Sequence, residues 1–330
     1  MDVVKSRIHW VDVAKGVLIL FLLIHHFGSA SRLSKVNSKD FDFVFVWQFV
    51  FTSFFIQAFF FMSGYCSNFS KPVLIFIKDI IKQLIIPFLF FELLNCIIFN
   101  LDDISIRNMY SYWVEANGTH LWFLNALIVS KVILYIIKSF YSDEWLLFIS
   151  LLLLFFAVYL KQRDIGSNFF CIRQCLGSVL FVALGYYVKN KSYMERFELL
   201  GWFFPIALLT MKLSGVTIPV FTANMDVGFK SLFLFLFVSI AGVIFFSMIC
   251  MKIAHSKFLE FLGRNTIIIY CVHFLFLQYF VVIFYSLIVP ENTYQRILYL
   301  VIVYIFELLA CVVSIEIFKH KPLKWIVGKW

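Results

Sequence analysis

The chain has 330 residues, of which 62% are hydrophobic and only 14% are charged, and its mean hydropathy is +0.93. About a quarter of the residues in a soluble domain are charged, so this composition excludes an ordinary soluble protein. The net charge of +9 does not indicate a nucleic-acid partner, because the basic residues lie in short loops and form no stripe interleaved with exposed aromatic residues.

Apolar stretches of about 20 residues recur from end to end, and each is long enough to cross the hydrocarbon core of a bilayer. We therefore expect an all-α integral membrane protein, a bundle of about ten transmembrane helices forming a single domain over residues 1–330. Lys and Arg are commoner in the segments that this topology places inside, which predicts that both termini are cytoplasmic. The predicted spans are 11–29, 43–64, 73–100, 120–140, 144–161, 171–189, 199–215, 230–252, 265–288 and 294–318.

The first span carries the densest group of ionisable residues. Lys15 and His26 are eleven residues apart, so on an α-helix they differ by about 20° in azimuth and by about 16 Å along the axis. They therefore share one face at two depths, whereas His25 points about 80° away. Asp12 lies one turn before Lys15 and can pair with it.

This spacing suits a group transfer, because Lys is a common binder of phosphate groups and His is the commonest general base. In the plainer interpretation, Lys15 extends toward lipid headgroups and His26 hydrogen-bonds a neighbouring helix. The spacing alone favours the plainer interpretation.

The third span is long and contains Pro87, which predicts a kink or a partly interfacial course. At the end of the second span, the small residues Ser63 and Gly64 suit either a narrow ligand arm or close helix packing, and helix packing is the commoner use.

Four sequence elements carry a resemblance to a known family. The first is an aromatic-x-Asp, then Lys-Gly, then His after ten intervening residues, formed by Trp10, Asp12, Lys15, Gly16 and His26. The others are Phe59-Phe-Phe-Met-Ser-Gly-Tyr65, Leu121-Trp-Phe-Leu-Asn-Ala-Leu127 and Asn265-Thr-Ile-Ile-Ile-Tyr-Cys-Val-His273. Together they resemble the acyltransferase 3 family of integral membrane O-acyltransferases, although Lys15 stands where Arg is commoner in that family.

The resemblance implies transfer of an acyl group, usually acetyl, from acyl-CoA in the cytoplasm to a hydroxyl of a cell-envelope glycan or lipid-linked sugar. It implies that His26 is the catalytic residue, as general base or as acyl carrier, and that Lys15 lies near the donor. It also implies a multi-pass protein of the bacterial inner membrane whose partners are acyl-CoA, the sugar acceptor and the lipid bilayer.

Further residues join this predicted site. Asp12 and His273 complete the catalytic set, and an interhelical hydrogen-bonding role for His273 is an equally good interpretation. Ser63 and Gly64 are the expected contacts of the donor's pantetheine arm, beside Lys15. The expected acceptor contacts are His120, Trp122, Asn125 and Glu92.

A carboxylate buried in a membrane usually needs a cation as partner. Lys131 and Arg173 are the candidate partners of Glu92 and Glu307, which lie within the third and tenth spans. The seven cysteines stand singly and mostly in apolar runs, so we interpret them as small core residues and predict neither a disulfide framework nor a metal site.

Two other functions remain open. A transporter or flippase for a glycan precursor also lines a path with buried charges, but the two halves of the chain show no convincing inverted repeat. A glycan polymerase predicts a larger outer loop with catalytic Arg or Asp, and the predicted outer loops are short.

Overall fold

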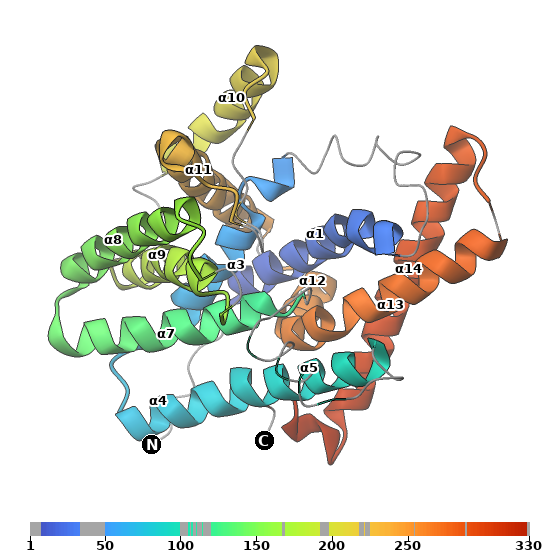
Figure 1. Ribbon diagram of the computed structural model, residues 1–330, viewed down its shortest axis with the longest axis horizontal. Helices are drawn as coiled ribbons and strands as arrows, with labels where there is room; N and C mark the ends of the chain where they lie inside the picture. The colour runs from blue at the N-terminus through green and yellow to red at the C-terminus, as the bar shows by residue number, and fades with distance from the viewer. Residues whose placement is uncertain are drawn as a thin grey trace.

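The structure is a computed structural model, and it is built of helices (Figure 1). It describes residues 8–33, 50–99, 105, 107, 110, 114, 120–166, 169–191, 198–217, 221, 225–253, 255–287 and 289–328. Throughout these residues the regular elements are helical and none is a strand, which confirms the predicted all-α class.

A helix occupies each of the ten predicted ranges, wholly or in part. The elements are α1 (His9–Leu33), α3 (Phe55–Cys66), α4 (Val73–Ile80), η2 (Ile81–Ile85), α5 (Ile86–Phe99), α7 (Trp122–Phe140), α8 (Asp143–Gln162), α9 (Ile172–Lys191), α10 (Glu198–Ser214), α11 (Phe229–Ile253), α12 (Lys257–Arg264), α13 (Thr266–Leu287), α14 (Thr293–Lys319) and η5 (Leu323–Trp325).

Six of these helices, α1, α7, α8, α11, α13 and α14, are long and apolar enough to cross a membrane. The others fall short for physical reasons: α3, α5 and α10 have fewer residues than a full span, and α9 carries Arg173, Gln174 and Lys189. A count of ten spans and the cytoplasmic position of both termini therefore stay predictions.

The third predicted span, 73–100, is divided into α4, the π-helix η2 and α5. Pro87 has no amide hydrogen, and its ring clashes with the carbonyl four residues earlier, at Gln83, which lies within η2. A π-helical turn at this point widens the helix and interrupts the regular hydrogen-bond ladder. The irregularity predicted from Pro87 is thus present as a π-helical turn.

The central helix of the bundle is α1, which packs against α3, α11, α12, α13 and α14 (Figure 1). Gly16 lies against the backbone of Leu259 in α12, where a Cβ would stand 2.1 Å from the carbonyl oxygen. Gly263 lies in the same way against Asp12, and a Cβ there would stand 1.8 Å from that carbonyl oxygen. The two glycines therefore let α1 and α12 cross in backbone contact.

The outer surface of the bundle carries large apolar side chains. Leu74, Leu213 and Phe233 are 78%, 79% and 82% exposed. Soluble proteins rarely leave extensive apolar surface uncovered, so these faces suit contact with lipid. Inside, one apolar core joins most of the helices, and a smaller cluster that includes Phe27 and Tyr299 joins α1, α13 and α14.

Candidate active site

Three histidines from different segments meet beside α1. Between ring centroids, His26 of α1 lies 5.2 Å from His273 of α13 and 6.5 Å from His120, just before α7. His120 and His273 are 5.1 Å apart, and we call the three the histidine cluster. His273 is fully buried and His120 is 7% exposed, whereas His26 is only partly buried. His26 is therefore the member that a substrate reaches most easily.

The backbone of α13 holds His273 in one tautomer. Its Nδ1–H donates to the carbonyl oxygen of Tyr270 at 2.8 Å and to that of Ile269 at 3.2 Å. Because a carbonyl oxygen only accepts, the proton sits on Nδ1 and Nε2 keeps a lone pair. Among the residues that the structure describes, this buried Nε2 has no hydrogen-bond partner. It is therefore available as an acceptor inside the histidine cluster.

The Asn…Tyr-x-x-His element builds this side of the site. Asn265 stands between α12 and α13, and its side-chain amide donates to the carbonyl oxygen of Phe261 at 2.8 Å. The hydroxyl of Tyr270 donates to the backbone carbonyl of His120. His273 lies one turn later in α13 and belongs to the histidine cluster. The element therefore shapes the α12–α13 junction and positions both His120 and His273.

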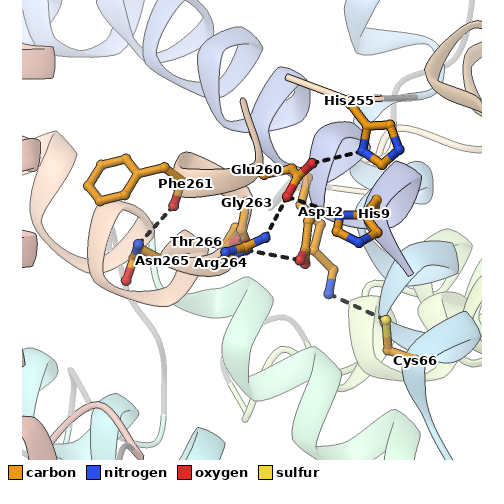
Figure 2. Close-up of polar contacts among 11 residues, drawn as sticks. His9, Asp12, Cys66, His255, Glu260, Phe261, Gly263, Arg264, Asn265 and Thr266 are labelled. Carbon is orange, nitrogen blue, oxygen red and sulfur yellow. Dashed lines mark hydrogen bonds and ion pairs between the residues drawn. The ribbon is translucent and has the colours of Figure 1, made fainter. Parts of the chain in front are cut away.

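Lys15 and His26 both contact neighbouring helices. The ammonium of Lys15 donates to Sγ of Cys66, at the end of α3, over 3.5 Å (Figure 2). Cys66 is exposed, whereas the other six cysteines are buried, in agreement with their interpretation as small core residues. His25 turns toward α3, where its ring lies 5.1 Å from that of Phe55.

Further cations gather around Lys15. Lys131 of α7 interacts electrostatically with Lys15 and with Lys71, and we call these three the lysine cluster. Asp79 forms an ion pair with Lys71 and balances part of the charge. Cations held close together repel one another unless an anion binds among them, so the lysine cluster suits the phosphate groups of a ligand.

The first and second sequence elements also meet at this end of α1. The rings of Trp10 and Tyr65 pack edge to face with centroids 5.1 Å apart. The ammonium of Lys189 lies 6.0 Å from the centroid of the Tyr65 ring. Aromatic faces next to cations offer stacking surface for a planar group, which complements the phosphate-binding character of the lysine cluster.

An ion network joins Asp12 of α1 to α12 (Figure 2). Nε of Arg264 lies 3.4 Å from Oδ2 of Asp12, and its Nη2 lies 2.5 Å from Oε2 of Glu260. Glu260 is also bonded by Nδ1 of His9 at 3.2 Å. The hydrogen bond from His9 lowers the pKa of Glu260, and Arg264 acts in the same direction. The structure shows Arg264 as a partner of Asp12, and the pairing of Asp12 with Lys15 suggested by the sequence spacing stays a prediction.

Gly64 has a packing role. It lies against the backbone of Val182 in α9, where a Cβ would stand 1.9 Å from the carbonyl oxygen. This close crossing of α3 and α9 accounts for Gly64 without a ligand. The neighbouring Ser63 is partly exposed, and its carbonyl accepts the hydroxyl of Ser67 at 2.8 Å. Contact of Ser63 and Gly64 with the donor stays a prediction.

Of the four expected acceptor contacts, His120 belongs to the histidine cluster. Asn125 is buried and its amide donates to the carbonyl oxygen of Phe170 at 2.8 Å, which ties α7 to the start of α9. The buried ring of Trp122 lies 6.4 Å from that of Phe221. These contacts give Asn125 and Trp122 structural roles, and their contact with an acceptor stays a prediction.

The fourth, Glu92 of α5, is fully buried and interacts electrostatically with Tyr270. It therefore lies near the turn of α13 that carries His273. Arg173, one of the two cations suggested as partners of the buried carboxylates, bonds Asp164 at 2.9 Å. Within the described part of the chain, neither carboxylate oxygen of Glu307 has a hydrogen-bond partner.

Sequence reasoning missed the neighbours that α12 brings to α1. A signal for α12 exists, because Ser256 caps the helix by accepting the backbone N–H of Leu259 at 3.4 Å. The sequence contains no comparable signal that Glu260 and Arg264 lie beside the first turn of α1. It likewise gives no sign that Lys131, on another helix, approaches Lys15, because such contacts arise only when the helices pack.

A family model described as an acyltransferase domain, that of the acyltransferase 3 family, matches residues 8–316, nearly the whole chain. No curated protein and no solved structure matches the chain. The matched residues include the histidine cluster, the lysine cluster and the ion network around Asp12.

Proposed function

Because this chain belongs to the acyltransferase 3 family and has several apolar helices of membrane length, we propose that it is a multi-pass membrane O-acyltransferase. The proposed donor is acetyl-CoA. The proposed acceptor is a hydroxyl of a cell-envelope glycan or a lipid-linked sugar, and the proposed location is the bacterial inner membrane. The single observation that carries this proposal is the meeting of His26 with His120 and His273.

In the proposed reaction His26 is the general base. It takes the proton of the acceptor hydroxyl as the oxygen attacks the thioester carbonyl carbon. The carbon–sulfur bond then breaks, and the proton passes to the departing thiolate of CoA. The products are the acyl ester and free CoA, so His26 returns to its starting state.

His273 has the geometry of a group that orients the base. A catalytic histidine works best when its second ring nitrogen is held by a fixed acceptor. Nε2 of His273 offers such an acceptor, on a ring fixed by its bonds to Tyr270 and Ile269 and 5.2 Å from the His26 ring. His120 is the third ring of the histidine cluster, and its backbone carbonyl accepts a hydrogen bond from the hydroxyl of Tyr270.

The lysine cluster is the proposed binding site for the donor's phosphates. Lys15 lies on the same side of α1 as His26, about 16 Å away by helical rise. A long, narrow pantetheine arm suits this separation, because it carries the thioester far from the phosphates. Trp10 and Tyr65 add an aromatic surface for the adenine ring.

Membranes from cells that produce the chain are the material for the test. They are incubated with acetyl-CoA labelled in the acetyl group, and label is then counted in the glycan and lipid-linked sugar fractions. We expect label to depend on the protein and to be lost in His26→Ala. His25→Ala is the matched control, because His25 faces α3, and it should retain most of the label.

Full labelling by His26→Ala, at equal protein level, would remove His26 from the proposed mechanism. A protein that moves an unlabelled glycan precursor across the membrane and incorporates no acetyl label would favour the transporter function instead.

A further inference from the structure

Three side chains that can bind a metal converge at the N-terminal end of α1, outside the histidine cluster (Figure 2). His9 is the first residue of α1, His255 lies just before α12, and Glu260 lies in the first turns of α12. Their ligand atoms all lie within 4.8 Å of one another. We propose that His9, His255 and Glu260 form a binding site for a divalent first-row transition-metal ion such as Zn²⁺.

The geometry is close to that of a tetrahedral site. Nδ1 of His9 lies 3.2 Å from Oε2 of Glu260, and Nδ1 of His255 lies 3.6 Å from Oε1. With metal–ligand bonds of about 2.0–2.1 Å, neighbouring ligand atoms of a tetrahedral zinc ion lie about 3.3–3.4 Å apart. Each distance to Glu260 is close to this range, but the two end on different carboxylate oxygens. Binding through one oxygen therefore needs a rotation of the carboxylate and an approach of the two imidazoles, whose ring centroids are 4.8 Å apart.

The scaffold allows that approach. Gly16 and Gly263 let α1 and α12 cross in backbone contact, which fixes Glu260 relative to His9. The side chain of His255 is 72% exposed, so it can rotate toward the other two ligands without disturbing the core.

The donor atoms match the preference of zinc. Imidazole nitrogen and carboxylate oxygen are common zinc ligands, and three protein ligands leave a fourth position for water. The metal takes the place of the proton between Nδ1 of His9 and Oε2 of Glu260, because a ligating imidazole nitrogen must be unprotonated.

Arg264 is the main competitor for Glu260, since its Nη2 lies 2.5 Å from Oε2. Asp12, however, lies 3.4 Å from Nε of the same guanidinium. When a metal binds Glu260, Asp12 can keep the charge of Arg264 paired. The bound ion would then join the start of α1 to α12 next to Asp12, one turn from Lys15.

The test uses the full chain, purified in detergent micelles with an affinity tag that contains no histidine, and freed of metal. Zn²⁺ binding is titrated calorimetrically for the parent protein and for His9→Ala, His255→Ala and Glu260→Gln. His320→Ala is the matched control, because His320 is also exposed but lies at the end of α14. We expect one ion per chain and at least about tenfold weaker binding in each of the three ligand variants.

Two further measurements keep the proposal open to refutation if a ligand variant folds poorly. Zn²⁺ should raise the thermal midpoint of the parent protein and of His320→Ala. It should raise the thermal midpoint of His255→Ala much less. Co²⁺ should give visible absorption bands without the thiolate absorption that binding through Cys66 would produce.

The proposal is overturned if the parent protein does not bind a single Zn²⁺ saturably. It is also overturned if His9→Ala and His255→Ala bind Zn²⁺ as tightly as the parent protein does. Because these readouts are metal affinity and thermal stability, they succeed or fail independently of acyl transfer.

Discussion

The crossing of α1 and α12 offers a sharp test of the site's framework, because Gly16 and Gly263 leave no room for a methyl group. A Cβ on Gly16 would stand 2.1 Å from the carbonyl oxygen of Leu259, and one on Gly263 would stand 1.8 Å from that of Asp12. To reach ordinary contact, which begins at 3.4 Å, the two backbones must separate by about 1.3–1.6 Å, since closely packed interiors contain little free space. That separation stretches the 3.4 Å contact between Arg264 and Asp12.

We therefore expect Gly16→Ala and Gly263→Ala each to cost about 1–3 kcal/mol of stability through overpacking. Displacement of the helix turn that carries Lys15 should also lower acyl transfer by about tenfold to 10²-fold. The assay combines thermal unfolding of the purified protein with counting of transferred acetyl label.

Gly228→Ala is the matched control for this pair, because a Cβ there would meet no atom within 4 Å. It should leave both the thermal midpoint and the activity unchanged. If Gly16→Ala and Gly263→Ala behave like Gly228→Ala, the two helices do not cross in backbone contact and the placement of Asp12 beside Arg264 is wrong.

Three further substitutions test single contacts. Tyr270→Phe removes the hydroxyl that bonds the His120 carbonyl, so acyl transfer should fall severalfold, and an unchanged rate would show that this bond does not position the site. Asn125→Ala leaves the Phe170 carbonyl with only the weak thiol donor of Cys175 and should lower the free energy of unfolding by about 0.5–1.5 kcal/mol, seen as a lower thermal midpoint. Lys131→Ala should raise the KM for acetyl-CoA severalfold with little change in kcat, and an unchanged KM would take Lys131 out of the donor site.

Much of the site's local geometry was predictable from the sequence. The spacing of Lys15 and His26 determines that they share one side of α1, since helical azimuth depends only on residue number. Pro87 likewise predicted the irregularity in the third span, because a proline in the interior of a long span lacks the amide hydrogen that the helical ladder needs.

The convergence of separate helices was not predictable in the same way. His120 was expected among the acceptor contacts and His273 in the catalytic set, and the two rings lie 5.1 Å apart. Helix packing places them together, and a single sequence contains no measure of crossing angle or register. The prediction of no metal site rested on the isolated cysteines, and the sequence gives no sign that His9 and His255 come together.

Steady-state kinetics of the purified protein can show whether α1 both binds the acyl donor and activates the acceptor hydroxyl. Lys15→Ala and His26→Ala are compared with the parent protein at varied acetyl-CoA concentration, together with direct measurement of acetyl-CoA binding. Lys15→Ala should raise the KM for acetyl-CoA by about tenfold and largely keep kcat, whereas His26→Ala should lower kcat by about 10²- to 10⁴-fold and still bind acetyl-CoA. A His26→Ala protein with the parental kcat would contradict the assignment of His26 as the base.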